Sequence, residues 1–186
     1  YYLLFSICFT NKQERNKYFY LITIIHATLF KALADPFNYV DTERYYYAYN
    51  AIQSYSFEKA VFTINNYTKW GQLFVVLNFI LGRISNSPII LYIVLSLIIV
   101  PGCMLFYKRT SYTPLLTILL YLIYPMMYIH SFGVLRQHLS VVFIMWALYY
   151  INQYKKFIPL LLIAIMFHTS AIVVIPFYLF KDFNFK

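Results

Sequence analysis

Charged residues are scarce in this sequence. They make up 11% of the 186 residues, and only six residues are acidic. Hydrophobic residues, by contrast, make up 62%. A soluble domain of this size cannot bury so much apolar surface, because its surface is large relative to its volume. The composition therefore excludes an ordinary soluble domain and predicts an integral membrane protein.

Cysteine is rare, and the motifs of several enzyme classes are missing. Cys8 and Cys103 lack CxxC spacing, which argues against a disulfide framework or a zinc site and favours two buried thiols. The sequence has no Walker loop, HExxH or GxSxG motif. ATP hydrolysis and zinc proteolysis therefore lack support, and we expect no metal or cofactor. No signal peptide is recognisable, and we expect the chain to be a fragment of a longer membrane protein.

Aromatic and basic residues are abundant instead. Tyrosine and phenylalanine number 21 and 18, which suits a protein with broad aromatic belts at the membrane interface. The net charge is +9, but the basic residues lie in short segments between apolar runs. At such positions they set membrane orientation and meet anionic lipid. The expected partner is thus the lipid bilayer, and nucleic acid is not expected.

Apolar runs of helix length recur along the chain. A spanning helix needs roughly 20 apolar residues. Lys31, near the end of the first such run, is expected to snorkel outward. The run 1–10 is too short to span the membrane, and we expect it to be the tail of a preceding helix. The run 72–81 is also too short to span. The candidate spans are residues 18–34, 89–106 (with a bend at Pro101–Gly102), 114–129, 135–150 and 157–179.

Loop charges predict the orientation of these spans. Residues 35–70 hold four of the six acidic residues and many tyrosines, so we expect an extracytoplasmic loop with interfacial helices. If residues 72–81 do not cross, NKQERNK (11–17), Lys108–Arg109 and Lys155–Lys156 are all cytoplasmic, as the positive-inside rule favours. We therefore predict an all-α bundle forming one transmembrane domain over residues 1–186. It has five spanning helices and one interfacial or re-entrant helix.

Arg136 is the first candidate functional residue. It begins a predicted helix on the outer side, and the helix face that it starts continues through Ser140 and Ala147, small residues able to face a cavity or another helix. A guanidinium there can grip a phosphate with two parallel hydrogen bonds. The alternative is an interfacial arginine that only snorkels.

His168 is the second candidate, about eleven residues into the predicted helix 157–179. The helices of Arg136 and His168 are joined by a tight turn, so we expect them to be antiparallel, with the two residues about 9 Å apart along the membrane normal. The alternative for His168 is a neutral histidine that bonds a neighbouring helix. His26, His130 and His138 are weaker candidates.

The segment DTERYY (41–46) is the densest charged cluster of the outer loop. It reads either as a solvated loop with a local Glu–Arg pair, or as a functional surface. In the second reading, a carboxylate acts as general base, or tyrosine rings and Asp41 contact a sugar.

Three segments in this order resemble the EpsG family, a branch of the Wzy-type polysaccharide polymerases. They are DTERYYYAYN (41–50), LRQHLS (135–140) and IAIMFHTSAIVVIP (163–176), and the similarity extends from about residue 17 to residue 180. The resemblance implies a fold similar to the GT-C glycosyltransferases, in the bacterial inner membrane. It also implies a metal-independent glycosyltransferase that joins repeat units carried on polyprenyl diphosphate at the outer face, in capsule, exopolysaccharide or O-antigen biosynthesis.

The resemblance also implies roles for individual residues. Catalytic roles fall on Arg136, Asp41 and His168, with Arg136 meeting the diphosphate of the lipid carrier. Substrate-binding roles fall on Arg44, Tyr45 and Gln137. The expected partners are a polyprenyl-diphosphate-linked oligosaccharide and other polysaccharide assembly proteins. Two rival functions use the same residues: a flippase for lipid-linked sugar, and a non-catalytic scaffold for polysaccharide assembly.

Overall fold

The computed structural model describes residues 12–35, 39–67 and 71–181, and every regular element in these ranges is a helix, which confirms the all-α prediction. Residues 1–10, with Cys8, and Lys69–Trp70 lie outside the described residues. The helices are α2 (Lys12–Ala32), α3 (Val40–Gln53), α4 (Phe57–Tyr67), α5 (Gln72–Ile84), α6 (Ile89–Thr110), α7 (Pro114–Ile123), α8 (His130–Gly133), α9 (Leu135–Tyr149), α10 (Tyr154–Phe167), the 3-10 helix η2 (Thr169–Val174) and α11 (Ile175–Leu179).

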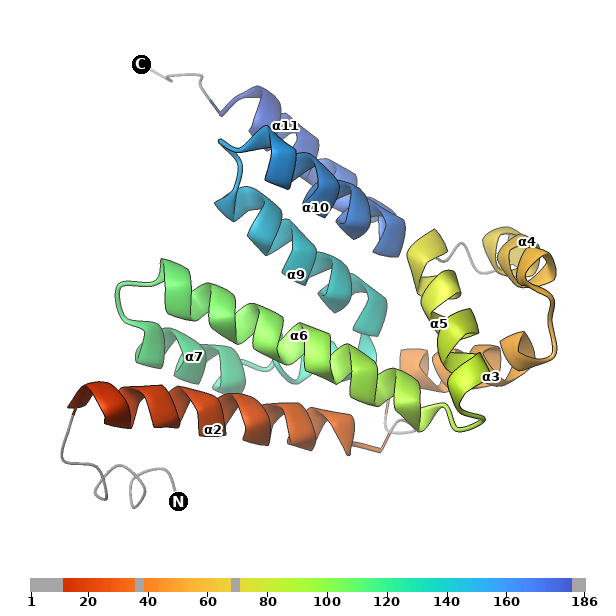
Figure 1. Cartoon of the computed structure of the whole chain (residues 1–186), viewed down its shortest axis with the longest axis horizontal. Helices are drawn as coiled ribbons and strands as arrows, with labels where there is room; N and C mark the ends of the chain where they lie inside the picture. Colours follow the sequence, from red (N-terminus) through yellow and green to blue (C-terminus); the bar gives the residue numbers. More distant parts are fainter. Residues whose placement is uncertain (1–11, 36–38, 68–70, 182–186) are drawn as a thin grey trace.

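The helices form two groups that meet near the start of α6 (Figure 1). Helices α2, α6 and α7 lie side by side, and α9 packs across α6 with α10 on its far side. Helices α3, α4 and α5 gather at the end where α2 finishes and α6 begins. Contacts between α5 and α10 join the two groups. The site described below lies at this junction.

Helix α6 carries the core of the bundle. Its 22 residues include buried side chains about one turn apart, among them Leu91, Leu95 and Ile99. The helix continues through Pro101, and the indole Nε1–H of Trp146 on α9 donates to the Gly102 carbonyl at 3.1 Å. Within the described ranges, α6 is the one helix that is long and apolar enough to cross a membrane. Shorter apolar helices cover Gln72–Ile84, Pro114–Ile123 and Thr169–Leu179.

Helix α2 differs from the prediction at both ends. It begins at Lys12, so most of NKQERNK is helical and does not form a turn. At the other end, Lys31 does not snorkel: its side chain is buried, with 4% exposed. The Lys31 ammonium donates to the Ser131 carbonyl and lies 4.6 Å from the centre of the Phe132 ring. These contacts give the buried ammonium a hydrogen-bond acceptor and an aromatic face inside the bundle.

The predicted span 114–129 is wrong, because α7 ends at Ile123. Proline disfavours helical backbone at the residue before it, and Tyr124, which precedes Pro125, is extended, with φ −77° and ψ 113°. Turns and the short helix α8 then lead to α9. The Tyr128 hydroxyl on this segment donates to the Ala27 carbonyl of α2 at 2.5 Å. Helix α9 itself matches the predicted run 135–150.

The predicted span 157–179 is also wrong, because the chain reverses at His168. Helix α10 ends at Phe167, and His168 is extended, with φ −153° and ψ 120°. Helices η2 and α11 then run back along α10 (Figure 1), so that the Phe157 and Tyr178 rings stack 4.5 Å apart. The His168 side chain accepts the Ser170 N–H, a local cap that competes with a continuing helix. His168 is therefore at an apex and not in mid-helix.

The short run 72–81 forms α5, whose first turn meets the end of α10 at Gly71. A Cβ atom added at Gly71 would collide with the backbone carbonyl oxygens of Met166 and Phe167. These atoms belong to the last turn of α10 and cannot move aside as a flexible side chain can. Only glycine permits this approach. The prediction of an interfacial or re-entrant helix is compatible with the 13-residue length of α5.

We expect Gly71→Ala to destabilise the protein by about 3 kcal/mol or more, because overpacking against backbone forces helices apart. Gly82→Ala, in the same helix, is the matched control. Its Cβ would meet only the Gln53 Cγ at 3.3 Å, and the helix gains up to about 1 kcal/mol from the better helix former. Thermal unfolding in detergent, followed by circular dichroism, measures both. Equal stability of the two variants would contradict the close contact.

Candidate functional site

The site begins at the first turn of α9, where Arg136 reaches back toward α3 and α5. Its half-buried guanidinium lies 5.7 Å from the centre of the Tyr45 ring and 5.9 Å from that of Phe74. The Arg136 Nε–H also donates a long hydrogen bond of 3.4 Å to the Tyr45 hydroxyl. These contacts position the cation. We call Arg136, Tyr45 and Phe74 the arginine clasp.

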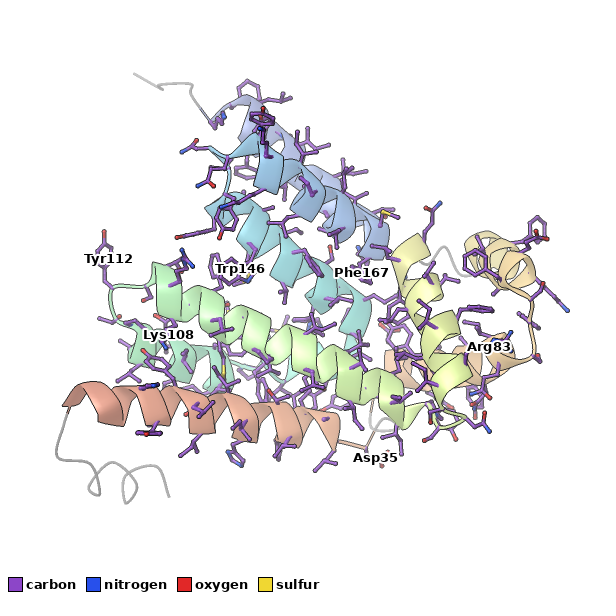
Figure 2. All side chains as sticks on the ribbon, viewed as in Figure 1. Asp35, Arg83, Lys108, Tyr112, Trp146 and Phe167 are labelled. Atoms are coloured by element: carbon purple, nitrogen blue, oxygen red, sulfur yellow. The ribbon has the colours of Figure 1, made fainter. Side chains whose placement is uncertain are left out.

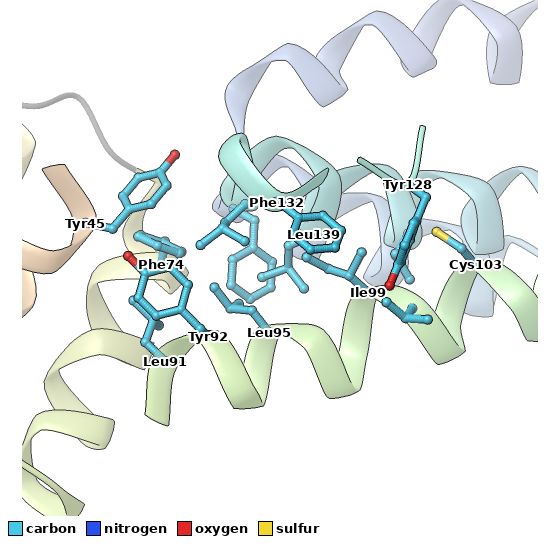
Figure 3. Close-up of a cluster of buried hydrophobic side chains, with 14 of the residues drawn as sticks. Tyr45, Phe74, Leu91, Tyr92, Leu95, Ile99, Cys103, Tyr128, Phe132 and Leu139 are labelled. Atoms are coloured by element: carbon cyan, nitrogen blue, oxygen red, sulfur yellow. The ribbon is translucent and has the colours of Figure 1, made fainter. Parts of the chain in front are cut away.

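Tyr45 is built into the clasp by the pattern of α3. Tyr45, Tyr49 and Ile52 recur at helical spacing and are buried, which turns this face of α3 inward. Tyr45 and Phe74 pack edge to face, with ring centres 5.3 Å apart. Figure 3 shows them at one end of a row of buried side chains that extends to Tyr128 and Cys103 at the other. Cys103 is buried and free, as predicted.

The protonation state of Tyr45 follows from its burial. Loss of solvent raises the pKa of the Tyr45 phenol, and the neighbouring Arg136 charge only partly opposes this. The phenol is therefore neutral at physiological pH. A neutral phenol holds the guanidinium by hydrogen bonding and by its ring face.

His168 lies across from the clasp, at the end of α10. Helices α9 and α10 pack together, and His168 is near enough to Arg136 for an electrostatic interaction between them. Its Nδ1 accepts the Ser170 N–H at 3.3 Å and lies 2.7 Å from the Ser170 hydroxyl. With Nδ1 engaged as an acceptor, the neutral ring carries its proton on Nε2, which then serves as a donor.

Asp41 lies one turn before Tyr45 on the same face of α3, and its charge acts on the Tyr45 phenol. It pairs with Arg44 at 3.8 Å, so the predicted Glu–Arg pair is an Asp–Arg pair instead. Arg44 is mostly exposed, and such a pair contributes little to stability. Gln137 is exposed and follows Arg136 by about 100° around α9. The structure thus relates Asp41 to Tyr45, Tyr45 to Arg136 and Arg136 to His168, and leaves Arg44 and Gln137 at the surface.

A groove of about 530 Å³ opens beside Asp41. His130, at the start of α8, forms another polar part of its wall. Sequence reasoning gave this residue little weight, because no other notable polar group is near it in the chain. Pro125 was the signal that could have found it, since the break there begins the turn that places His130 in the groove wall. The groove is lined by Tyr39, Asp41, Pro125, Ile129, His130, Gly133 and Val134.

A much smaller cavity lies behind the groove, with room for about one water molecule (10 Å³). Lys31 from α2 and Asp35, just beyond the end of α2, line it together with Tyr39, which also borders the groove. Lys31 is the second residue that sequence reasoning missed, since its position near a helix end suggested snorkelling. Within the described ranges, no three His, Cys, Asp or Glu side chains gather as metal ligands would.

Comparison with known proteins identifies the family of the chain. The model of the EpsG family matches residues 17–186, which is most of the chain. The chain belongs to the EpsG family. This family is associated with exopolysaccharide biosynthesis, and the resemblance seen in the sequence is thereby confirmed. No curated protein and no solved structure gave a match.

The clasp predicts unequal effects of two changes at Tyr45. Tyr45→Phe removes the long hydrogen bond to Arg136 and keeps the ring, and should cost about 1 kcal/mol or less. Tyr45→Ala also removes a buried ring and should cost about 3–5 kcal/mol. The free energy of unfolding in detergent, from urea titration, measures both changes. A large loss in Tyr45→Phe would mean that the hydroxyl, and not the ring, holds α3 in place.

Proposed function

We propose that this chain is the site-bearing part of a membrane polysaccharide polymerase. It joins oligosaccharide repeat units that are carried on polyprenyl diphosphate. The observation that supports this most is the arginine clasp: a half-buried cation, held by aromatic rings, next to a groove with a carboxylate in its wall. Family membership places the chain in exopolysaccharide biosynthesis, where such a reaction is needed.

The membrane setting is part of this proposal. Leucine, isoleucine and phenylalanine side chains stand exposed on the outer faces of α2, α7 and α10, among them Leu29, Leu119 and Leu162 at 52–53% exposed. Apolar faces of this extent are stable against lipid and not against water. We propose a multi-pass protein of the bacterial inner membrane. Lys108 and Tyr112 lie at the end of the bundle opposite Asp35 and Arg83 (Figure 2). We assign the end that carries Lys108 to the cytoplasm, as the positive-inside rule favours.

The reaction requires one bond to form and one to break. A hydroxyl of the acceptor sugar attacks the anomeric carbon of the donor, and the bond to the diphosphate breaks with its electron pair on the diphosphate oxygen. Arg136 stabilises the charge of the departing diphosphate. The His168 Nε2–H donates to the same group. Asp41 accepts the proton of the attacking hydroxyl. Arg44 and Gln137 bind substrate, and Tyr45, a predicted substrate-binding residue, instead positions Arg136.

We expect Arg136→Ala in the full-length protein to lower polymerisation at least 100-fold, as loss of a charge-stabilising donor does in other enzymes. Arg136→Lys keeps the charge but loses the two-pronged grip, and should remain impaired. Arg109→Ala is the matched control. Arg109 also donates to a tyrosine hydroxyl (Tyr149, 2.8 Å) and lies over its ring, but at the opposite end of the bundle.

The assay supplies polyprenyl-diphosphate repeat units to proteoliposomes and reads the chain-length ladder. An unchanged ladder in Arg136→Ala would remove Arg136 from the reaction. If the wild type instead carries labelled lipid-linked sugar across the bilayer without elongating it, the protein is a flippase. If alanine at Arg136, Asp41 and His168 leaves polysaccharide output intact in cells, the protein is a scaffold.

The proposed orientation predicts which residues a membrane-impermeant maleimide reaches in intact cells. The background is a variant with Cys8 and Cys103 replaced by serine and alanine. Glu58→Cys, exposed on α4 at the outer end, should react in intact cells. Tyr112→Cys, fully exposed in the loop after α6, should react only after the cells are opened. Labelling of Tyr112→Cys in intact cells would contradict the proposed orientation and indicate the opposite one.

A further inference from the structure

We propose that the groove beside Asp41 is the acceptor site, which receives the terminal sugar of the acceptor chain, and that His130 binds it. This inference rests on the proposed polymerase function and assigns the two substrates to separate parts of the site. The donor diphosphate lies at the arginine clasp, and the acceptor sugar lies in the groove.

Charge separates the two parts. Asp41 in the groove wall repels a diphosphate, whereas Arg136 in the clasp attracts one. A neutral polyol has the opposite preference, because a carboxylate accepts hydrogen bonds from hydroxyl groups. The groove is therefore suited to a sugar without phosphate, which is the terminal residue of the acceptor.

The groove walls supply what a sugar needs. Tyr39 offers a ring to the apolar face of a sugar ring, and Ile129 and Val134 offer aliphatic surface to the same face. Asp41 accepts hydrogen bonds, and the His130 imidazole can both donate and accept them. The volume of about 530 Å³ lies within the range typical of small-molecule sites.

His130 is held in place before any ligand arrives. Its backbone N–H donates to the Pro125 carbonyl at 2.8 Å, which fixes the turn that precedes α8. Its ring lies 5.3 Å from that of His138, whose Nδ1 is 3.1 Å from the Val134 carbonyl. Such support lowers the entropic cost of binding, because the side chain is already ordered. His130 is thus a preorganised binding residue.

One turn of α3 connects the groove to the clasp. Asp41 lines the groove, and Tyr45, four residues later on the same face, holds Arg136. An acceptor hydroxyl bonded to Asp41 therefore lies next to the place where the donor diphosphate is gripped. This is the arrangement that transfer of a glycosyl group between the two requires.

The test measures initial rates in proteoliposomes of the full-length protein. The donor is kept saturating, and a soluble repeat-unit oligosaccharide without diphosphate is the varied acceptor. We expect His130→Ala to raise the KM for this acceptor about tenfold, the effect of one lost hydrogen bond, with little change in kcat or in the KM for donor. Asp41→Asn should lower kcat. His26→Gln, on an exposed position of α2, is the matched control and should leave all constants unchanged.

A second variant keeps the proposal testable if His130→Ala does not fold. Ile129→Trp starts from a side chain that is 47% exposed and fills the groove, so it should also raise the acceptor KM. An unchanged acceptor KM in either folded variant overturns the acceptor site while the polymerase function stands. A raised KM for donor alone also overturns it and assigns the groove to the lipid chain. Absence of elongation by the wild type means that the polymerase function itself fails.

Discussion

The site depends on the backbone contact between α5 and the end of α10. This contact brings α3 and α5, which carry Tyr45 and Phe74, against α9 and α10, which carry Arg136 and His168. The aromatic rings that hold the guanidinium come from one group of helices, and the guanidinium comes from the other. Because the contact passes through Gly71, it needs no side-chain interdigitation and fixes the spacing of the two groups within narrow limits.

The sequence predicted the parts of the site better than the path of the chain between them. Helix α9 and the position of Arg136 in its first turn followed from an apolar run bounded by loop charges. The breaks at Tyr124 and His168 did not, because an apolar run in a membrane protein has the same composition whether it is one helix or two. The signals were local: a proline after Tyr124, and a histidine, threonine and serine able to cap the backbone.

Other misses have a common cause, which is that distance in the chain hides contacts in space. His130 lacks polar neighbours in sequence, yet it shares a groove with Asp41. Lys31 resembles a snorkelling residue, yet its ammonium meets the Ser131 carbonyl, a hundred residues away. Neither contact produces a periodic pattern in the sequence. By contrast, the proximity of Asp41 to Tyr45 follows from helical spacing alone once α3 is known to be a helix.

The two bonds from α2 to the segment before α9 have a mechanical consequence. The Tyr128 hydroxyl reaches Ala27, and Lys31, one turn later on α2, reaches Ser131. Two attachment points one turn apart resist both sliding and rotation, so the end of α2 and the start of α9 move as one rigid unit. In the membrane setting proposed above, a change in bilayer thickness that tilts α2 also displaces the segment that leads into Arg136.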